Sequence, residues 1–355
     1  MVKLANIFGG VKTFFQANLG RRLLIFTNRL IKGELTLLAY EDYDDYIRDT
    51  ANSCISVRAT LRAVCSITFD GTDRAKAESA FRNGEGFTTQ REFVEQVSNN
   101  LDVFGNSCYY LKKDVSTDSL DLLSMPDMVF YLDRRQVVAY GVRKDPQKPP
   151  VGLEAKQVLH FKTTNAFSTI GRSIVASLSE YLKMKRYLSA SWARNLQNDG
   201  VPSGYIKYKS KGKTEEQLKQ VLEDWERKYS WNSEGHRVGV LDGDGDYVPI
   251  QSRGLDYGSD HNKIRDGVRE GFRTPKVILG DTDGVNFSNA FTSLLAFKLT
   301  ELDPFHQKLG GDLTYFFQNN GYDVTVTVKG TLDLEDFRAI AGATGRLQVN
   351  AGNNE

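Results

Sequence analysis

The segment Lys211-Gly212-Lys213-Thr214 contains Gly-Lys-Thr, the end of a phosphate-binding loop that holds nucleotides. A complete loop needs a glycine five residues before Gly212, and that position is Lys207. A solvated turn that leads into a helix, with Thr214 as its N-cap, agrees better with the sequence. We therefore expect no nucleotide site here.

A second segment, LDGDGDY at residues 241–247, places acids at alternate positions, as calcium-binding loops do. Such a loop needs a glycine where Tyr247 stands and a glutamate where Arg253 stands. Asp-Gly pairs supply the positive φ of a tight turn, so the segment predicts a β-hairpin between strands at 237–241 and 247–250. A weak, adventitious cation site is the alternative.

Neither the histidines nor the cysteines form a reactive or metal-binding set in the sequence. The histidines lie on separate predicted elements without ligand spacing: His160, His236, His261 and His306. No Gly-x-Ser-x-Gly or His-Glu-x-x-His motif is present. The cysteines are odd in number and lack a Cys-x-x-Cys pair, which predicts reduced, buried thiols at Cys54, Cys65 and Cys108. We expect no catalysis, no metal and no cofactor.

The composition is that of a folded protein without a strong overall charge. The 355-residue chain is 40% hydrophobic and 26% charged, with a formal net charge of +1. A near-neutral chain has no global field that attracts DNA or membranes, so any DNA contact has to come from local charge. The apolar and basic start, residues 1–39, has uncharged runs too short for a signal peptide or a membrane span.

Hydrophobic periodicity predicts an α+β fold. In the first half we expect helices at 42–68 and 88–103, the second with Thr89 and Glu92 as a capping box, and a loop over 69–87. The strands expected there are 107–111, 120–123, 128–132, 136–142 and 157–161. The elements expected later are helices at 173–197, 214–229, 255–273, 289–318 and 334–341, and strands at 204–208 and 324–328. The helices at 173–197 and 255–273 bracket a small α/β insert, and this order predicts an arm on the main body.

Several stretches, in this order, resemble the portal proteins of tailed bacteriophages, in the small form typical of long-tailed phages. They are LDVFGNSCYYLKKD (101–114), QVLHF (157–161), TIGRSIVASLSEYLKMKRYLSASWARNLQNDGVPSGYIKY (169–208), GVREGFRTPKVILGD (267–281) and FKLTELDPFHQKLGGDLTYFF (297–317). No single motif decides the matter, but the ordered set is fairly specific over roughly residues 50–320.

The resemblance implies an elongated, ring-forming subunit with named parts. They are an N-terminal arm (1–39), a mixed α/β wing (40–170), a first stem helix (171–200), a small α/β clip (201–253), a second stem helix (254–274), a tunnel loop (275–288), a long core helix (289–320) and a C-terminal wing or crown remnant (321–355).

The same resemblance implies a function without catalysis. Portal proteins form a homododecameric ring at one capsid vertex, in the virion, through which double-stranded DNA is packaged and later ejected. The implied partners are the large terminase subunit, the major capsid protein and head–tail adaptors. The ring is expected to assemble in the host cytoplasm. Two alternatives stay open: a soluble α+β enzyme with its site at the 275–288 loop, and an adaptor ring without DNA passage.

Charged residues of the second stem helix and the tunnel loop are the candidates for the channel surface. Arg265, Arg269 and Arg273 form one stripe of the helix, with Asp266 and Glu270 beside it. These arginines pair within the helix, pair with acids of a neighbouring copy, or face the DNA. The candidates in the loop are Lys276, Asp281, Asp283 and Asn286.

Two groups of apolar residues are candidates for protein contacts. Trp225, Tyr229 and Trp231 are expected to anchor the clip to neighbouring copies or to docking partners, since a clip of this size could barely support a core of its own. Apolar residues of the tunnel loop are expected to contact neighbouring copies: Val277, Ile278, Leu279 and Val285.

Overall fold

A computed structural model describes most of the chain between residues 49 and 339. The described residues are 49–114, 117–133, 136–143, 145, 149–197, 204–208, 214–217, 219–220, 223, 239–242, 247–249, 257–281, 284–333 and 335–339. The N-terminal arm and most of the predicted clip, including Trp225, Tyr229 and Trp231, lie outside them. The chain divides into two compact units, one of residues Met1–Ser179 with Val268–Glu355 and one of Glu180–Gly267.

The first unit begins with helix α4 (Asp49–Arg62) and strand β1 (Cys65–Asp70). The prediction of one helix to residue 68 is therefore wrong at its end. β1 pairs antiparallel along its whole length with β11 (Thr325–Gly330). Ile67 and Phe69 alternate with exposed residues, which is the pattern of a strand with one buried face.

Helix α5 (Arg74–Arg82) lies in the stretch predicted as a loop. It buries Ala77, Ala80 and Phe81, which lie at helical spacing between charged residues. The next helix, α6 (Gln90–Phe104), begins as predicted, because the Thr89 side chain accepts from the Glu92 N–H at 3.1 Å. The Glu92 carboxylate in turn accepts from Thr88, and the helix ends at Gly105 in the left-handed conformation.

Two three-stranded antiparallel sheets follow, in the orders β3-β2-β7 and β4-β5-β6. Their strands are β2 (Asn106–Lys112), β3 (Ser119–Leu123), β4 (Met128–Asp133), β5 (Gln136–Val142), β6 (Val151–Leu153) and β7 (Val158–Lys162). All of them except β6 were predicted. Beside α6 the rings of Phe81, Phe93, Tyr109 and Phe161 contact one another, with centroids 4.8–6.1 Å apart between successive members.

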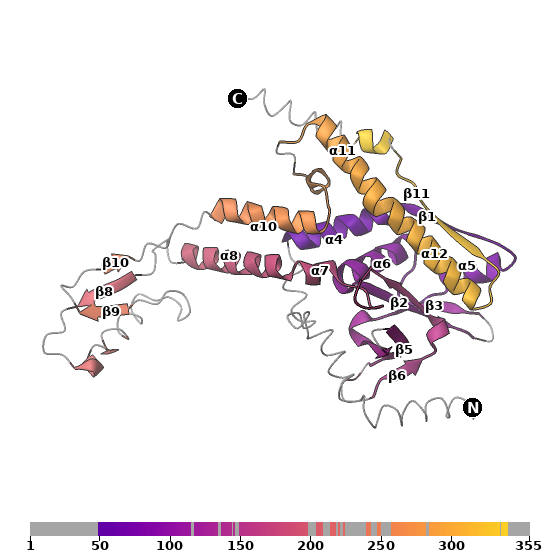
Figure 1. The fold of residues 1–355 in the computed structure, drawn as a ribbon, viewed down its shortest axis with the longest axis horizontal. Helices are drawn as coiled ribbons and strands as arrows, with labels where there is room; N and C mark the ends of the chain where they lie inside the picture. The colour runs from indigo at the N-terminus through magenta and orange to yellow at the C-terminus, as the bar shows by residue number, and fades with distance from the viewer. Residues whose placement is uncertain are drawn as a thin grey trace. The chain divides into compact units, whose positions relative to one another are not determined.

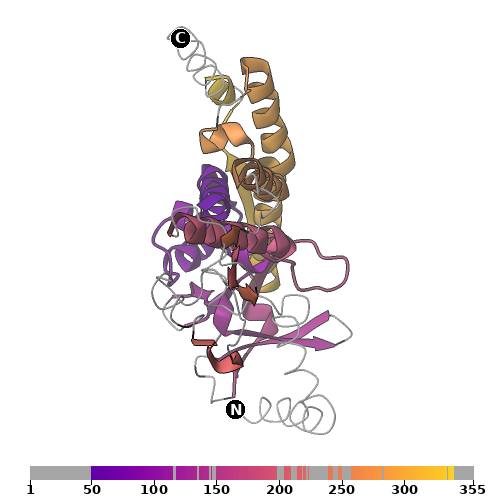
Figure 2. The same ribbon diagram turned by 90° about the vertical axis from the view of Figure 1, so that its left-hand side faces the viewer.

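The long C-terminal helix of this unit is interrupted once. It consists of α11 (Phe287–Phe297), a π-helical turn (Lys298–Leu302) and α12 (Asp303–Asn319), which continue one another as one rod in Figure 1. Figures 1 and 2 both show the indigo helix α4 beside this rod. Gly310 lets α12 approach β11 closely, since a Cβ there would lie 3.0 Å from the Val326 carbonyl oxygen.

Short helix α7 (Ile174–Ser177) and α8 (Ser179–Gln197) replace the single helix predicted over 173–197, with the Ser173 side chain capping α7. In the second unit a three-stranded sheet has the order β10-β8-β9. The strands are β8 (Gly204–Tyr208), β9 (Gly239–Asp242) and β10 (Tyr247–Pro249). The predicted hairpin is wrong, because β8 lies between β9 and β10 and pairs parallel with β9. Helix α10 (Tyr257–Gly271) contains the boundary between the units.

Candidate functional site

Helix α10 ends in a left-handed turn that begins the predicted tunnel loop. The Arg273 N–H donates to the Glu270 carbonyl at 2.9 Å, and the Thr274 N–H donates to the Arg269 carbonyl at 3.0 Å. This bonding pattern places Arg273 at the position that glycine usually occupies, and its φ is indeed 51°. An L-residue other than glycine costs about 1–2 kcal/mol in this conformation. Pro275 follows two residues later and prevents the helix from resuming.

An ion pair joins the end of α10 to a residue just after the next short helix. Nη1 of Arg269 lies 2.5 Å from Oδ2 of Asp281, and both side chains are largely buried. Between them Lys276–Leu279 forms a 3-10 helix that ends at Gly280 with φ 78°. Part of the predicted tunnel loop is thus tied to the end of α10.

The apolar residues of the loop pack inside the chain. Val277 and Val285 are buried in a cluster with Ala290, Leu294 and Phe297 of α11, and Ile278 packs against that cluster. The expectation that Val277 and Val285 contact neighbouring copies is wrong, because their side chains already anchor the loop to the helix behind it.

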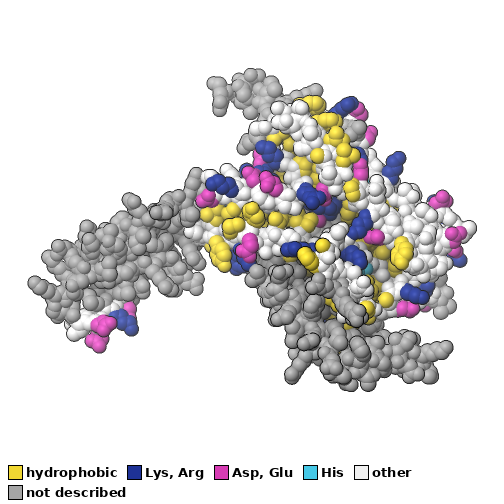
Figure 3. Space-filling view, viewed as in Figure 1, with side chains coloured by type: hydrophobic (Ala, Val, Ile, Leu, Met, Phe, Trp, Pro, Cys, Tyr) yellow, Lys and Arg dark blue, Asp and Glu magenta, His cyan; other side chains and the backbone are white. Residues whose placement is uncertain are grey.

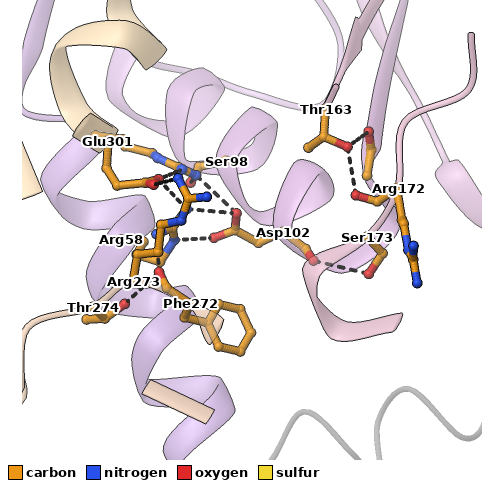
Figure 4. A network of polar contacts seen from close by, with 12 residues as sticks. Arg58, Ser98, Asp102, Thr163, Arg172, Ser173, Phe272, Arg273, Thr274 and Glu301 are labelled. Carbon is orange, nitrogen blue, oxygen red and sulfur yellow. Dashed lines mark hydrogen bonds and ion pairs between the residues drawn. The ribbon is translucent and has the colours of Figure 1, made fainter. Parts of the chain in front are cut away.

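Beside this loop lies a buried network of charges, shown in Figure 4. Arg58 and Arg62 lie one turn apart on the buried face of α4, Asp102 lies on α6, and Glu301 lies in the π-helical turn. Arg58 Nε is 2.9 Å and Arg62 Nη1 is 3.2 Å from the carboxylate of Asp102. Both guanidinium groups also contact Oε2 of Glu301, at 3.0 and 3.3 Å.

Burial acts on the two arginines in different proportions. Desolvation is the largest single influence on Arg58 and opposes its charge, but the attraction of Asp102 and Glu301 and their hydrogen bonds together exceed it and raise the pKa. For Arg62 desolvation prevails and lowers the pKa, although Asp102 attracts it. Arg62 Nε is buried without a hydrogen-bond partner among the described residues. The network is therefore held by its carboxylates and is sensitive to the loss of either one.

Two further contacts connect the network to the end of α10. Arg58 Nη1 donates to the carbonyl oxygen of Phe272, and Thr274 Oγ1 donates to the same oxygen at 3.3 Å. Arg273 Nη1 lies 3.2 Å from Oε1 of Glu301, although the Arg273 side chain is 73% exposed and that of Glu301 only 11%. Glu301 thus contacts the buried arginines with one oxygen and the exposed arginine with the other.

The predicted channel residues differ in their surroundings. Arg269 and Asp281 are paired and largely buried, Arg273 is exposed at the edge of the network, and Lys276 is half-buried in the 3-10 helix. Arg265 is half-buried in the second unit. Asn286 has a structural role, because its Oδ1 accepts from the Asn289 N–H at 2.9 Å and caps α11. Asp283 lies outside the described residues.

The buried network was not predicted from the sequence. Its signal was present, since Arg58 and Arg62 follow Cys54 and Ile55 at spacings that put all four on one helix face. Charged residues on an apolar face indicate buried partners.

A family model described as "Phage portal protein" matches residues 50–347. The chain belongs to this family. Members of this family are structural proteins of the virion, and this portal protein is one of them. No curated protein sequence matches it significantly.

The portal fold also occurs in solved structures of low sequence identity. A chain of the "Virion of native gene transfer agent (GTA) particle" has 16% identity and a TM-score of 0.55, over 88% of this chain and 89% of that one. A chain from the "Neck of native GTA particle computed with C12 symmetry" has 17% identity and a TM-score of 0.52, over 85% of each. An HK97 family phage portal protein from Corynebacterium diphtheriae has 12% identity and a TM-score of 0.56, over 81% of this chain and 95% of that one.

The described residues of this portal chain contain no group of three metal-ligating side chains, and no described helix is long and apolar enough to cross a membrane. The thiols of Cys54 and Cys108 are buried as predicted, whereas Cys65 is half-buried. On the face that Figure 3 shows, the basic and acidic side chains of the described residues are interspersed rather than gathered by sign.

Proposed function

We propose that this portal chain forms a ring at one capsid vertex and that double-stranded DNA passes through the ring during packaging and ejection. The observation that carries the proposal is the family match over residues 50–347. A similar chain occurs in a neck with C12 symmetry, which supports twelve copies. Such a ring uses a heterologous interface, in which one face of each copy meets a different face of the next.

The partners follow from the same proposal. During packaging the ring docks the large terminase subunit through residues 201–253, and head–tail adaptors take that place afterwards. The capsid shell surrounds the wing, residues 40–170. Trp225, Tyr229 and Trp231 are the proposed anchors of the docking region. The energy of packaging then comes from another protein, since this chain is proposed to be no enzyme.

The charge distribution suits a surface along which DNA slides. Each phosphate that a cation neutralises tightens binding, so a ring of many free arginines would hold the duplex in place. The net charge of the chain is only +1, and Arg269 is already paired with Asp281. We propose that residues 275–288 line the narrowest part of the channel and present few free cations there.

The size of the purified particle tests the proposal. Light scattering should give a mass near twelve chains, and negative-stain images should show a central opening wide enough for a duplex. A protein that stays monomeric or dimeric over a range of salt concentrations would refute ring formation. A closed or very narrow opening would refute DNA passage and leave an adaptor ring.

A further inference from the structure

We propose that Arg273 is an exchangeable phosphate ligand, which leaves Glu301 to contact the backbone of passing DNA and returns to it afterwards. Arg269, four residues earlier on the same predicted stripe, serves the fold instead. The inference rests on the proposed DNA channel and names the residue that contacts the duplex.

The charges of the network single out Arg273. The buried members are two arginines, Arg58 and Arg62, and two carboxylates, Asp102 and Glu301, so they balance without Arg273. Arg273 adds one positive charge to a set that is already neutral. When Arg273 leaves, no buried charge loses its compensation, which removes the main cost of breaking a buried pair.

The geometry of Glu301 permits this exchange. Its Oε2 accepts from Arg58 and Arg62, whereas its Oε1 contacts Arg273. Departure of Arg273 therefore leaves both contacts of Oε2 in place. Because the Arg273 side chain is 73% exposed, it can reach an external anion without unfolding its surroundings.

The backbone supplies an independent argument. Arg273 is the one non-glycine residue with positive φ among those that the structure describes. Glycine would satisfy the turn without strain, so the turn itself gives no reason for an arginine. Strain that persists at such a position indicates a role for the side chain.

Arg269 lacks these properties. Its side chain is 8% exposed, and Asp281, 17% exposed, lies 2.5 Å away. Withdrawal of Arg269 would leave the carboxylate of Asp281 partly buried without this partner. The two arginines of the stripe therefore divide into a structural one and an exchangeable one.

The proposed ligand is a phosphodiester oxygen because the channel passes DNA and guanidinium groups bind phosphate in a planar, two-pronged manner. Because Glu301 competes with the phosphate for Arg273, each contact between Arg273 and DNA stays weak. Weak contacts that form and break in turn suit a duplex that has to move through the ring.

The experiment measures binding of a fluorescent DNA duplex to assembled rings by anisotropy over a range of salt concentrations. Arg273→Gly removes the side chain and relieves the turn, so the variant should fold and assemble at least as well as the wild type. Arg273→Lys retains the charge. Arg91→Ala is the matched control, because Arg91 is also an exposed arginine, paired with Glu95 at 2.9 Å, on the surface of α6.

We expect the salt dependence of Arg273→Gly to be shallower, by about 0.9 in the slope of log K against log salt for each phosphate that the ring no longer neutralises. Arg273→Lys and Arg91→Ala should stay close to the wild-type slope. If Arg273→Gly rings assemble and keep that slope, the inference is wrong while the channel proposal stands. The inference is also wrong, and the channel proposal again stands, if wild-type rings with an open channel bind no duplex at low salt.

The assembly state of the variants shows whether Arg273 contacts a neighbouring copy of the chain instead of DNA. If Arg273→Gly rings dissociate under conditions in which Arg91→Ala rings stay intact, Arg273 contacts a neighbouring copy and not DNA, which also overturns the inference. If the wild type forms no ring, the proposed function itself fails.

Discussion

Arg269 and Asp281 join the last turn of α10 to the far side of the turn that follows it, with 2.5 Å between Nη1 and Oδ2. The Asp281 N–H also donates to the Lys276 carbonyl at 3.1 Å, so the residue is held by both its side chain and its backbone. Val285, four residues later, is buried against α11. The base of the proposed tunnel loop is therefore fixed at two points.

Asp281→Asn should destabilise this base. The substitution leaves the guanidinium of Arg269, which is largely buried, facing a neutral amide, and we expect a loss of about 1–3 kcal/mol in the free energy of unfolding. Urea denaturation measures it. The control is Glu95→Gln, which breaks the exposed pair with Arg91 and should change stability little. Equal effects of the two substitutions would show that the Arg269–Asp281 pair does not hold the loop.

Local signals explain which parts of the fold could be predicted. The start of α6 depends on Thr89 and Glu92, three residues apart, and the strands β2 to β5 depend on short apolar runs. Strand β1 was missed because its partner, β11, lies far along the chain, as the pairing of Cys65 with Gly330 shows. The hairpin was wrong for a similar reason, since Asp-Gly pairs predict a turn but not which strand lies beside which.

The candidate site also has a part that local sequence signals predict and a part that depends on residues far apart in the chain. The stripe of arginines is visible in the sequence, but the difference between Arg269 and Arg273 depends on Asp281 and Glu301 and on a left-handed residue that no sequence pattern marks. Glu301 is far from Arg58 in the chain, and the π-helical turn that contains it has no simple signature.

Asp102→Leu should be strongly destabilising. It leaves Glu301 as the remaining carboxylate of the network beside the buried Arg58 and Arg62, and loss of one partner of a buried ion pair costs about 3–5 kcal/mol. The double variant Arg62→Met, Asp102→Leu restores the balance with one arginine and one carboxylate, and should recover part of that loss. Thermal or urea unfolding of the single and double variants measures the difference. A double variant that is less stable than Asp102→Leu would contradict the charge balance described above.

Two glycines that differ in their surroundings give opposite expectations. A Cβ on Gly171 would lie 1.9 Å from the carbonyl oxygen of Gly105, so Gly171→Ala has to displace the backbone that links α6 to β2. We expect a loss of about 2 kcal/mol or more, the size that overpacking of a rigid core produces. Gly311 in α12 has open space around its Cβ position, so Gly311→Ala should stabilise the protein by up to about 1 kcal/mol. Denaturation midpoints that move in the same direction for both variants would show that the close approach at Gly171 is not rigid.

His160 should make the first unit less stable in acid. Asn106 donates its amide to the carbonyl of Gly171, so its Oδ1 accepts from His160 Nε2, 2.9 Å away. Nδ1 then accepts from the Tyr140 hydroxyl at 3.2 Å, and the ring is neutral. Burial, together with the charges of Lys162 and Lys308, lowers the pKa of His160 to about 3.

The direction of the pH dependence follows from proton uptake. Above the ordinary histidine pKa of about 6.5 neither state binds the proton, and the full stability is present. As pH falls from about 6.5 towards 3, the unfolded chain binds a proton at His160 that the folded chain does not bind, so stability decreases by at most about 1.4 kcal/mol per pH unit.

His160→Gln removes this dependence, although it lowers stability at neutral pH. The difference in unfolding free energy between wild type and His160→Gln should therefore be constant from pH 7 to 9 and should shrink by about 2 kcal/mol between pH 7 and 5. Urea denaturation of both proteins across this range measures the difference, and a constant difference down to pH 5 would mean that His160 accepts its proton in the folded state.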